Sequence, residues 1–247
     1  MNSVILDARS REAFKAGHRE GAIHADLETQ LSSARDPGAD PARGGRHPLP
    51  PVERWLAQVA EWGIKPETRV TVYDDQNGAN AAARVWWMLR AIGIENVDVQ
   101  HVGTGFSPSG ARAEARATLS WQLPTVTLQD VDRLRNDPEW RVLDVRATPR
   151  FRGDTEPIDP VAGHIPGAVN LPYTENSGKS PAELRAMYEE LLGGVPPERL
   201  IVHCGSGVTA CQTLLALEMA GLRGASLYVG SWGEWCRNDM PIGKVRE

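Results

Sequence analysis

The sequence predicts an α/β protein made of two tandem domains of one kind, each a mostly parallel sheet flanked by helices. A chain of 247 residues has the length of two average domains, which mostly run about 100–200 residues each. Four short motifs recur in the same order in the two halves. In each half, short β-branched runs alternate with apolar stretches of helical period, which is typical of parallel sheets with helical connections.

The first repeated element is a strand that ends in an acidic residue. LDAR at residues 6–9 recurs as LDVR at residues 143–146, each after an apolar run. The aspartate and arginine of each copy are expected to pair through charge-assisted hydrogen bonds at the strand end. In the second copy, Asp144 and Arg146 are expected to tie the loop after residue 204 to its support. GHREGAIH at residues 17–24 then matches GHIPGAVN at residues 163–170, and we interpret each Gly-His motif as a turn of fixed backbone geometry. The second copy carries an insertion around residues 154–161.

The second repeated element is a strand, a loop of small residues and a helix. RVTVYD at residues 69–74 matches RLIVHC at residues 199–204, and both β-branched runs predict strands. The helices are expected over residues 80–92 and 209–220. A final short match pairs Val102 and Gly103 with Val229 and Gly230.

Two irregular segments complete the predicted organisation. Residues 107–124 are rich in Ala, Arg, Ser and Pro without an apolar period, which predicts a surface linker between domains at residues 1–115 and 116–247. Residues 33–51 contain five prolines and several glycines, which predicts an irregular loop within the first domain.

The composition excludes several classes of protein and partner, and it indicates the cellular compartment. Hydrophobic residues make up 41% and charged residues 24%, which argues against a disordered, collagen-like or coiled-coil chain. A net charge of −5 without a long basic run argues against nucleic-acid or membrane-surface partners. The amino terminus has no targeting pattern, the longest apolar stretch is too short to span a bilayer, and three cysteines suit a reducing compartment. We therefore expect a cytoplasmic protein.

The two halves differ at the end of their matching strands, where the first has Asp74 and the second Cys204. Sites in open α/β sheets form at the carboxyl ends of strands, where a following helix presents unpaired N–H donors and partial positive charge. A thiol held there is expected to ionise readily and act as a nucleophile. The loop that would surround it consists of small or uncharged residues: Gly205, Ser206, Gly207, Val208 and Thr209.

The three cysteines also allow roles other than nucleophilic catalysis by Cys204. A buried core thiol is the common fate of a free cysteine, and it is the preferred interpretation of Cys211 and Cys236, although a Cys204–Cys236 redox pair stays open. A phosphatase would need an arginine six residues after Cys204, where this chain has Ala210. A protease-like Cys/His pair is disfavoured, because His203 precedes Cys204 on the strand and must point the other way. No cofactor or metal motif is present in the sequence.

These motifs, together with GSW at residues 230–232, make the chain resemble tandem-domain rhodanese-type sulfurtransferases, with a Cys204 loop similar to that of 3-mercaptopyruvate sulfurtransferases. The resemblance implies an inert first domain and a catalytic second domain in which Cys204 carries sulfur as a persulfide. The donor would be a small molecule, and the acceptor cyanide or a thiol such as thioredoxin. A thiosulfate:cyanide sulfurtransferase and a non-catalytic persulfide carrier are the alternatives.

The resemblance also assigns roles to individual residues. The uncharged Gly205 and Ser206 favour mercaptopyruvate over thiosulfate, and Ser206 would assist proton movement at the developing enolate. Gly207, Val208 and Thr209 would complete the substrate-binding loop. Arg150 falls where the family places its first carboxylate-binding arginine. The family's second arginine has no counterpart after Glu156 and Pro157, and Arg152 is the expected substitute. His18 of the first domain matches a histidine that relatives present to the substrate, with a hydrogen-bonded structural histidine as the alternative.

Overall fold

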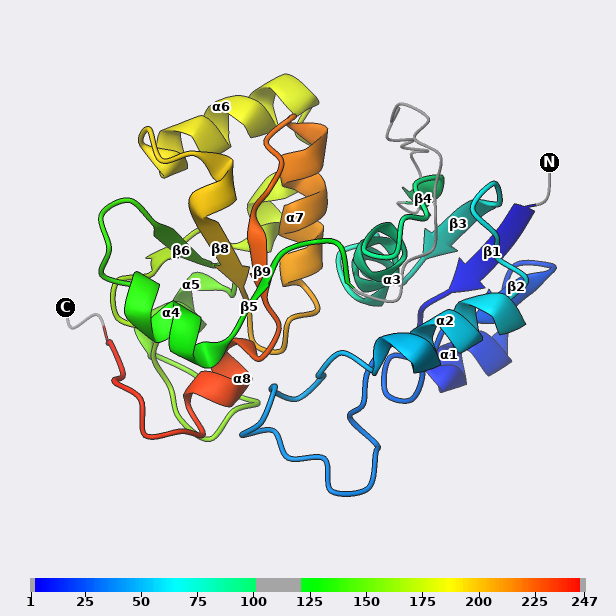
Figure 1. Cartoon of the computed structure of the whole chain (residues 1–247), viewed down its shortest axis with the longest axis horizontal. Coiled ribbons are helices and arrows are strands. Elements are labelled where there is room, and N and C mark those ends of the chain that lie inside the picture. Colours follow the sequence, from blue (N-terminus) through cyan, green and yellow to red (C-terminus); the bar gives the residue numbers. More distant parts are fainter. Residues whose placement is uncertain (1–2, 101–120, 245–247) are drawn as a thin grey trace. The chain divides into compact units, whose positions relative to one another are not determined.

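The computed structural model describes residues 3–100 and 121–244, and the chain forms two compact units (Figure 1). Unit 1 comprises residues 1–37 and 49–123, and unit 2 comprises residues 38–48 and 124–247. The predicted boundary at residue 115, most of the predicted linker and the motif at Val102 lie outside the described residues. Within the described ranges, every helix is too short or too polar to cross a membrane.

Unit 1 is a four-stranded parallel sheet in the order β2-β1-β3-β4. Its described elements follow the chain as β1 (Ser3–Asp7), α1 (Arg11–Ala16), β2 (Ala22–His24), α2 (Val52–Glu61), β3 (Arg69–Tyr73), α3 (Ala81–Arg90) and β4 (Val97–Gln100). The register aligns Asp7 with Tyr73, so β1 and β3 end side by side and both motifs meet at one edge of the sheet.

Unit 2 is a five-stranded parallel sheet in the order β5-β9-β8-β6-β7. Its strands are β5 (Thr125–Val126), β6 (Arg141–Asp144), β7 (Val169–Asn170), β8 (Leu200–His203) and β9 (Ser226–Tyr228). Its helices are α4 (Leu128–Leu134), α5 (Thr148–Arg152), α6 (Pro181–Leu192), α7 (Ala210–Met219) and α8 (Ser231–Trp235), with short 3₁₀ turns at Tyr173–Asn176 and Pro197–Arg199. The α/β prediction with parallel sheets is confirmed.

Helices cover both faces of the unit 2 sheet. Figure 1 shows α6 and α7 on one side and α4 and α8 on the other. Ile201 of β8 joins the apolar cluster formed by α4 and α8, which contains Leu128, Val131, Trp232 and Trp235. Because side chains alternate along a strand, Leu200 and Val202 point to the opposite face. All four residues of β8 are buried, so its carboxyl end is a rigid support for the loop that follows.

The predicted loop at residues 33–51 does not lie wholly within the first unit. Residues 38–48, which we call the arm, pack with unit 2. The N–H of Gly44 donates to Glu234 Oε1 at 2.7 Å, and Asn238 Nδ2 donates to the Ala42 carbonyl at 3.0 Å. Gly45 has a φ of +81°, and a Cβ there would lie 2.4 Å from the Gly230 oxygen, so only glycine fits this approach. These contacts join residues nearly 200 positions apart, which local sequence patterns do not reveal.

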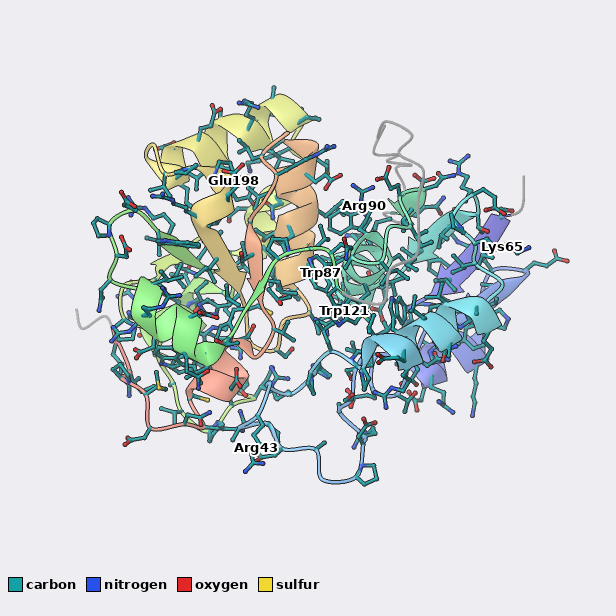
Figure 2. All side chains as sticks on the ribbon, in the orientation of Figure 1. Arg43, Lys65, Trp87, Arg90, Trp121 and Glu198 are labelled. Carbon is teal, nitrogen blue, oxygen red and sulfur yellow. The ribbon has the colours of Figure 1, made fainter. Side chains whose placement is uncertain are left out.

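The exposed side of the arm differs from its packed side. Arg43 extends away from the ribbon (Figure 2), and its side chain is 89% exposed. Arg46, three residues later, is only 21% exposed and forms an ion pair with Asp159 of unit 2. The arm therefore offers two arginines in opposite environments.

The repeated motifs build the same hydrogen-bonded turn in both units. Arg9 Nη2 donates to Asp7 Oδ2 at 2.6 Å and to the Gly17 carbonyl at 2.7 Å. Arg146 Nη2 makes the matching bonds to Asp144 Oδ2 and the Gly163 carbonyl at the same two distances. The predicted pairs are confirmed, but each arginine fastens the strand end to the Gly-His turn, whereas the sequence suggested that Arg146 would hold the Cys204 loop.

Candidate active site

Cys204 is the first residue after β8, at the carboxyl end of the sheet and just before α7. Its N–H donates to Ser231 Oγ at 3.2 Å, and its carbonyl accepts from the Trp232 N–H at 3.0 Å. The next carbonyl, of Gly205, accepts from the Gly233 N–H at 2.9 Å. The start of α8 thus fixes the backbone that carries the thiol, and the sequence had singled out the Gly-Ser-Trp motif without this role.

Ser231 makes this support possible by adopting an unusual backbone. Its φ is +54°, in the left-handed region that L-residues other than Asn and Asp rarely enter. There its hydroxyl accepts from Cys204 and donates to the Tyr228 carbonyl at 2.9 Å. The conformational cost of about 1–2 kcal/mol is offset by two hydrogen bonds inside a fully buried site.

The loop after Cys204 is tight, and several of its amides have no acceptor among the described residues. Gly207 has a φ of +71°, and a Cβ there would lie 2.4 Å from the Val229 oxygen. Within the described part of the chain, no protein acceptor takes the N–H groups of Gly205, Ser206, Val208 or Thr209. Thr209 is the N-cap of α7 and makes no side-chain capping bond. These donors are available to an anion at the start of the helix.

The equivalent loop of unit 1 contains such an anion. Asp74 occupies the position that corresponds to Cys204, and its buried carboxylate accepts four amide hydrogen bonds. The donors, at 2.7–3.0 Å, are the N–H groups of Gln76, Gly78, Asn80 and Ala82. The first three correspond in the repeat to Ser206, Val208 and Ala210. The strand, loop and helix of this fold therefore form a ring of donors around one anion at this position.

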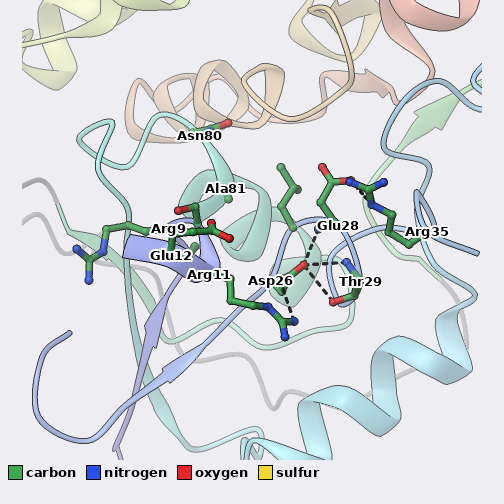
Figure 3. A pocket seen from close by; sticks show the side chains of 12 residues that line it. Arg9, Arg11, Glu12, Asp26, Glu28, Thr29, Arg35, Asn80 and Ala81 are labelled. Atoms are coloured by element: carbon green, nitrogen blue, oxygen red, sulfur yellow. Dashed lines mark hydrogen bonds and ion pairs between the residues drawn. The ribbon is translucent and has the colours of Figure 1, made fainter. Parts of the chain in front are cut away.

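Unit 1 also has a pocket at this end of its sheet, but its charges cancel. The pocket has a volume of about 530 Å³ and includes Asn80 and Ala81 in its wall (Figure 3). Three arginines and three carboxylates line it: Arg9, Arg11, Arg35, Glu12, Asp26 and Glu28. Arg11 pairs with Asp26 at 3.3 Å and Arg35 with Glu28 at 3.2 Å. Unit 1 therefore combines a ring of N–H donors that is occupied by the Asp74 carboxylate with a pocket of no net charge.

Unit 2 places cationic side chains beside its loop. Arg150, in α5, donates from Nη2 to Glu156 Oε1 at 2.6 Å and from Nε to Glu156 Oε2 at 3.1 Å. A Cβ at Gly205 would lie 3.4 Å from Arg150 Nη2 and 2.9 Å from Arg46 Nη2. Two guanidinium groups thus reach the residue next to Cys204. Arg150 was predicted from the sequence, and Arg46 was not.

Buried carboxylates hold these arginines in place. Burial opposes ionisation of Glu156, but the hydrogen bonds from Arg150 and from the amides of Asp159 and Ile158 lower its pKa overall. Burial likewise opposes ionisation of Asp144, but the charge and the hydrogen bonds of Arg146 lower its pKa overall. Both groups are therefore anions at neutral pH, and they anchor a chain of ion pairs that ends beside the Cys204 loop.

Comparison with known proteins agrees with this geometry. A family model described as a rhodanese-like domain matches residues 1–107 and 127–238. The chain belongs to the rhodanese family. The two matches coincide with the two repeats, and the second contains Cys204 and its loop.

Relatives with curated names cover almost the whole chain. A Pseudomonas aeruginosa protein provisionally named 3-mercaptopyruvate sulfurtransferase is 37% identical over 261 residues, which is 94% of this chain and 88% of the relative. A Mycobacterium tuberculosis protein provisionally named thiosulfate sulfurtransferase SseB is 37% identical over 264 residues, which is 97% of this chain and 90% of the relative. The solved 3-mercaptopyruvate sulfurtransferase from Leishmania major has a TM-score of 0.73 at 28% identity, covering 96% of this chain and 70% of that chain.

The remaining predicted residues of the rhodanese site lie in varied surroundings. Ser206 is buried in the loop, and its Oγ has no hydrogen-bond partner among the described residues. Arg152 lies in α5 with its Nε 3.5 Å from Asp154 Oδ2. His18 belongs to unit 1, where its ring stacks on Phe14 at 3.9 Å and its Nδ1 lies 2.9 Å from the Phe14 carbonyl. His164 stacks on Phe151 in the same way, so the histidine is part of the repeated turn.

The other thiols and His203 have structural surroundings. His203 Nδ1 lies 3.1 Å from the Cys204 carbonyl, and its Nε2 lies 3.9 Å from Asp144. Burial lowers the pKa of His203 although Asp144 opposes this, so its ring is neutral. Cys211 is buried and donates to the Gly207 carbonyl at 3.4 Å. Burial and the charge of Asp159 raise the pKa of Cys236. All three cysteines are free thiols, and no cluster of metal-binding side chains occurs among the described residues.

Proposed function

We propose that this rhodanese is a sulfurtransferase that moves sulfur from 3-mercaptopyruvate to a thiophilic acceptor through a persulfide on Cys204. One observation carries the proposal. Cys204 stands in a loop whose counterpart in unit 1 surrounds a carboxylate with four N–H donors, and arginines line the same loop in unit 2. The names of the Pseudomonas and Leishmania relatives support the donor.

The first half-reaction loads the enzyme. The Cys204 thiolate attacks the sulfur of 3-mercaptopyruvate, an S–S bond forms, and the bond between that sulfur and C3 breaks. The electron pair of the broken bond leaves as the enolate of pyruvate, which then takes a proton to give pyruvate. Ser206, directly in the loop, is our candidate for carrying that proton. The loop N–H groups stabilise the negative charge on the thiolate and on the persulfide.

The second half-reaction unloads the enzyme. Cyanide or a thiolate attacks the outer sulfur of the persulfide, the S–S bond breaks, and the Cys204 thiolate is regenerated with release of thiocyanate or a new persulfide. Thioredoxin, as a thiol-bearing protein, is the proposed physiological type of acceptor. Arg152 is a further candidate for a substrate contact, with Gly205, Gly207, Val208 and Thr209 supplying the loop, and a substrate contact of His18 stays a prediction from the resemblance.

A thiosulfate:cyanide sulfurtransferase is the second candidate, because the Mycobacterium relative carries that activity in its provisional name. The two candidates differ in the donor that the loop accepts. Gly205 and Ser206 add no further positive charge to that of Arg46 and Arg150, whereas a thiosulfate dianion carries two negative charges close to its reacting sulfur. Uncharged residues there favour a donor whose carboxylate is separated from its sulfur by carbon atoms.

Steady-state assays with both donors test the proposal. Wild-type protein is expected to form pyruvate from 3-mercaptopyruvate with a kcat/KM at least tenfold above that for thiosulfate, and Cys204→Ser is expected to be inactive with both. Intact-mass spectrometry after donor exposure should show one added sulfur on wild-type protein and none on Cys204→Ser. A preference for thiosulfate would favour the second candidate. Single sulfur loading without repeated turnover would instead identify a persulfide carrier.

We also propose that the protein works in the cytoplasm without nucleic-acid or membrane partners. Three free thiols and a negative net charge support this. Fractionation of cells that express the tagged protein would test it, and recovery in a membrane or secreted fraction would contradict it.

A further inference from the structure

We propose that Arg46 of the arm is the second carboxylate-binding arginine of the site and acts with Arg150 to select acidic sulfur donors. The inference deepens the proposed function and rests on it for the identity of the donor. Its starting point is the position of the two guanidinium groups. Both reach within 3.4 Å of the place where a Cβ of Gly205 would stand, and Gly205 follows the nucleophile directly.

Each guanidinium has a terminal nitrogen near Gly205 that is available to a ligand: Arg46 Nη2 at 2.9 Å and Arg150 Nη1 at 3.6 Å from the position of a Gly205 Cβ. Arg46 uses Nε to bind Asp159 Oδ1 at 3.1 Å, and the described residues provide no acceptor for its Nη1 and Nη2. Arg150 uses Nε and Nη2 to bind Glu156, and no described residue accepts from its Nη1. Each arginine is therefore held from behind by a buried carboxylate and presents terminal N–H donors beside the loop. Paired guanidinium donors match the two oxygens of a carboxylate.

The charges of the network leave room for one more anion. Four arginines share three buried carboxylates, and the members are Arg46, Arg146, Arg150, Arg237, Asp144, Glu156 and Asp159. Every arginine pairs with at least one of these carboxylates, and the network as a whole carries one net positive charge. A bound substrate carboxylate would compensate this charge at Arg46 and Arg150, whose side chains are 21% and 18% exposed.

Asp159 explains why the arginine comes from the arm. It lies in the insertion around residues 154–161 that the first repeat lacks. Its carboxylate receives Arg46 Nε at 3.1 Å and Arg237 Nη1 at 2.7 Å, and Arg150 Nη2 lies 3.6 Å away. The buried Asp159 carboxylate therefore holds a cation from a distant segment, Arg46, close to Arg150.

Gly205 is the residue that admits this arrangement. Its backbone is not in the left-handed region, so conformational freedom does not explain a glycine there. A side chain would instead come within 2.9 Å of Arg46 Nη2 and displace it. The glycine opens the space where a carboxylate two carbons away from the attacked sulfur can meet both guanidinium groups.

Alkylation of Cys204 by iodoacetate and iodoacetamide tests the inference without turnover. The two reagents form the same bond to the same thiol, and only iodoacetate carries a carboxylate. The ratio of their rates therefore cancels changes in thiol reactivity or loop mobility. In Arg46→Gln the iodoacetate to iodoacetamide ratio at Cys204 is expected to fall about tenfold. Arg43→Gln, on the same arm but exposed, is the matched control and should stay within twofold of wild type.

Steady-state kinetics give the second readout. Arg46→Gln is expected to lower kcat/KM for 3-mercaptopyruvate about 10- to 100-fold, mainly through KM, and Arg46→Lys should recover part of the loss because it restores the charge without the fork. An unchanged alkylation ratio in Arg46→Gln, or no alkylation of Cys204 in native wild-type protein, would overturn the inference. If wild type fails to use 3-mercaptopyruvate while the ratio still depends on Arg46, the proposed donor is wrong and the carboxylate subsite stands.

Discussion

The loops after β3 and β8 are two copies of one structure with opposite uses. In unit 1 the carboxylate of Asp74 fills the ring of amide donors from within the chain. In unit 2 Cys204 stands in the same place, and the N–H groups of Gly205, Ser206, Val208 and Thr209 have no acceptor among the described residues. The comparison indicates that the fold supplies an anion site at this point of each repeat, and that the residue type there separates a structural tie from the reaction centre that we propose.

A second difference concerns the charges around each loop. The pocket of unit 1 has equal numbers of arginines and carboxylates in its wall. The network of unit 2 has one arginine more than its buried carboxylates, and two of its members reach Gly205. The nucleophile and the excess positive charge therefore occur in the same unit, as binding and turnover of an anionic donor require.

The largest effect is expected from placing the unit 1 residue in unit 2. Cys204→Asp should abolish turnover, since no nucleophilic sulfur remains, while its free energy of unfolding stays within about 1 kcal/mol of wild type because the loop amides accept a carboxylate. Cys211→Asp, equally buried in α7 but outside the ring of donors, should lose about 3 kcal/mol or more. Chemical denaturation measures both, and equal destabilisation of the two variants would refute the shared anion site.

A somewhat smaller effect is expected when the unit 2 cation is removed. Arg150→Gln should lower kcat/KM for 3-mercaptopyruvate about 100-fold, or ~2.7 kcal/mol, because the donor loses a charge-assisted pair. Arg133→Gln, in α4 and paired with Asp130 at 3.0 Å, is the control and should change the same constant less than twofold. Equal losses in the two variants would contradict a specific role of Arg150.

A substitution at Asp74 in the unit 1 loop should change the stability of the protein and leave its activity unchanged. Asp74→Asn is expected to lower the free energy of unfolding by about 2 kcal/mol. The asparagine oxygen can accept from two of the four N–H groups, but its NH₂ group would face the other two N–H donors. Asp75→Asn, exposed at the next position, should change it by less than about 0.5 kcal/mol. Loss of activity in Asp74→Asn without a change in stability would contradict a structural role.

The smallest expected effect is in the pH dependence of stability. The pKa of Glu156 is lowered in the folded protein from an ordinary value of 4.5, so its contribution is complete above pH 4.5 and is lost as the pH falls through the folded pKa. Wild type should therefore lose on the order of 1 kcal/mol more than Glu156→Gln between neutral pH and pH 3.5. Glu190→Gln, an exposed glutamate of α6, should follow the wild-type curve, and parallel curves for all three proteins would contradict the buried role of Glu156.

Much of the architecture was predictable because it follows from local patterns. The helices expected over residues 80–92 and 209–220 are observed as α3 (Ala81–Arg90) and α7 (Ala210–Met219). Apolar runs that end in LDAR or LDVR became strands because β-branched and apolar residues pack well in a buried parallel sheet. The position of Cys204 at a strand end was also predictable, since the repeat aligned it with Asp74.

The partners of the site were not predictable, because they depend on contacts between distant segments. The sequence alone determined the repeat, the parallel α/β units and the placement of one thiol at the start of a helix, all of which depend on residues close together in the chain. Only the tertiary structure decided that Asp159 draws Arg46 across 113 positions to the Cys204 loop, and that Ser231 holds the thiol's backbone. The physical reason is that a buried carboxylate takes whichever cation the folded chain brings within reach, and the spacing of residues in the sequence does not encode that distance.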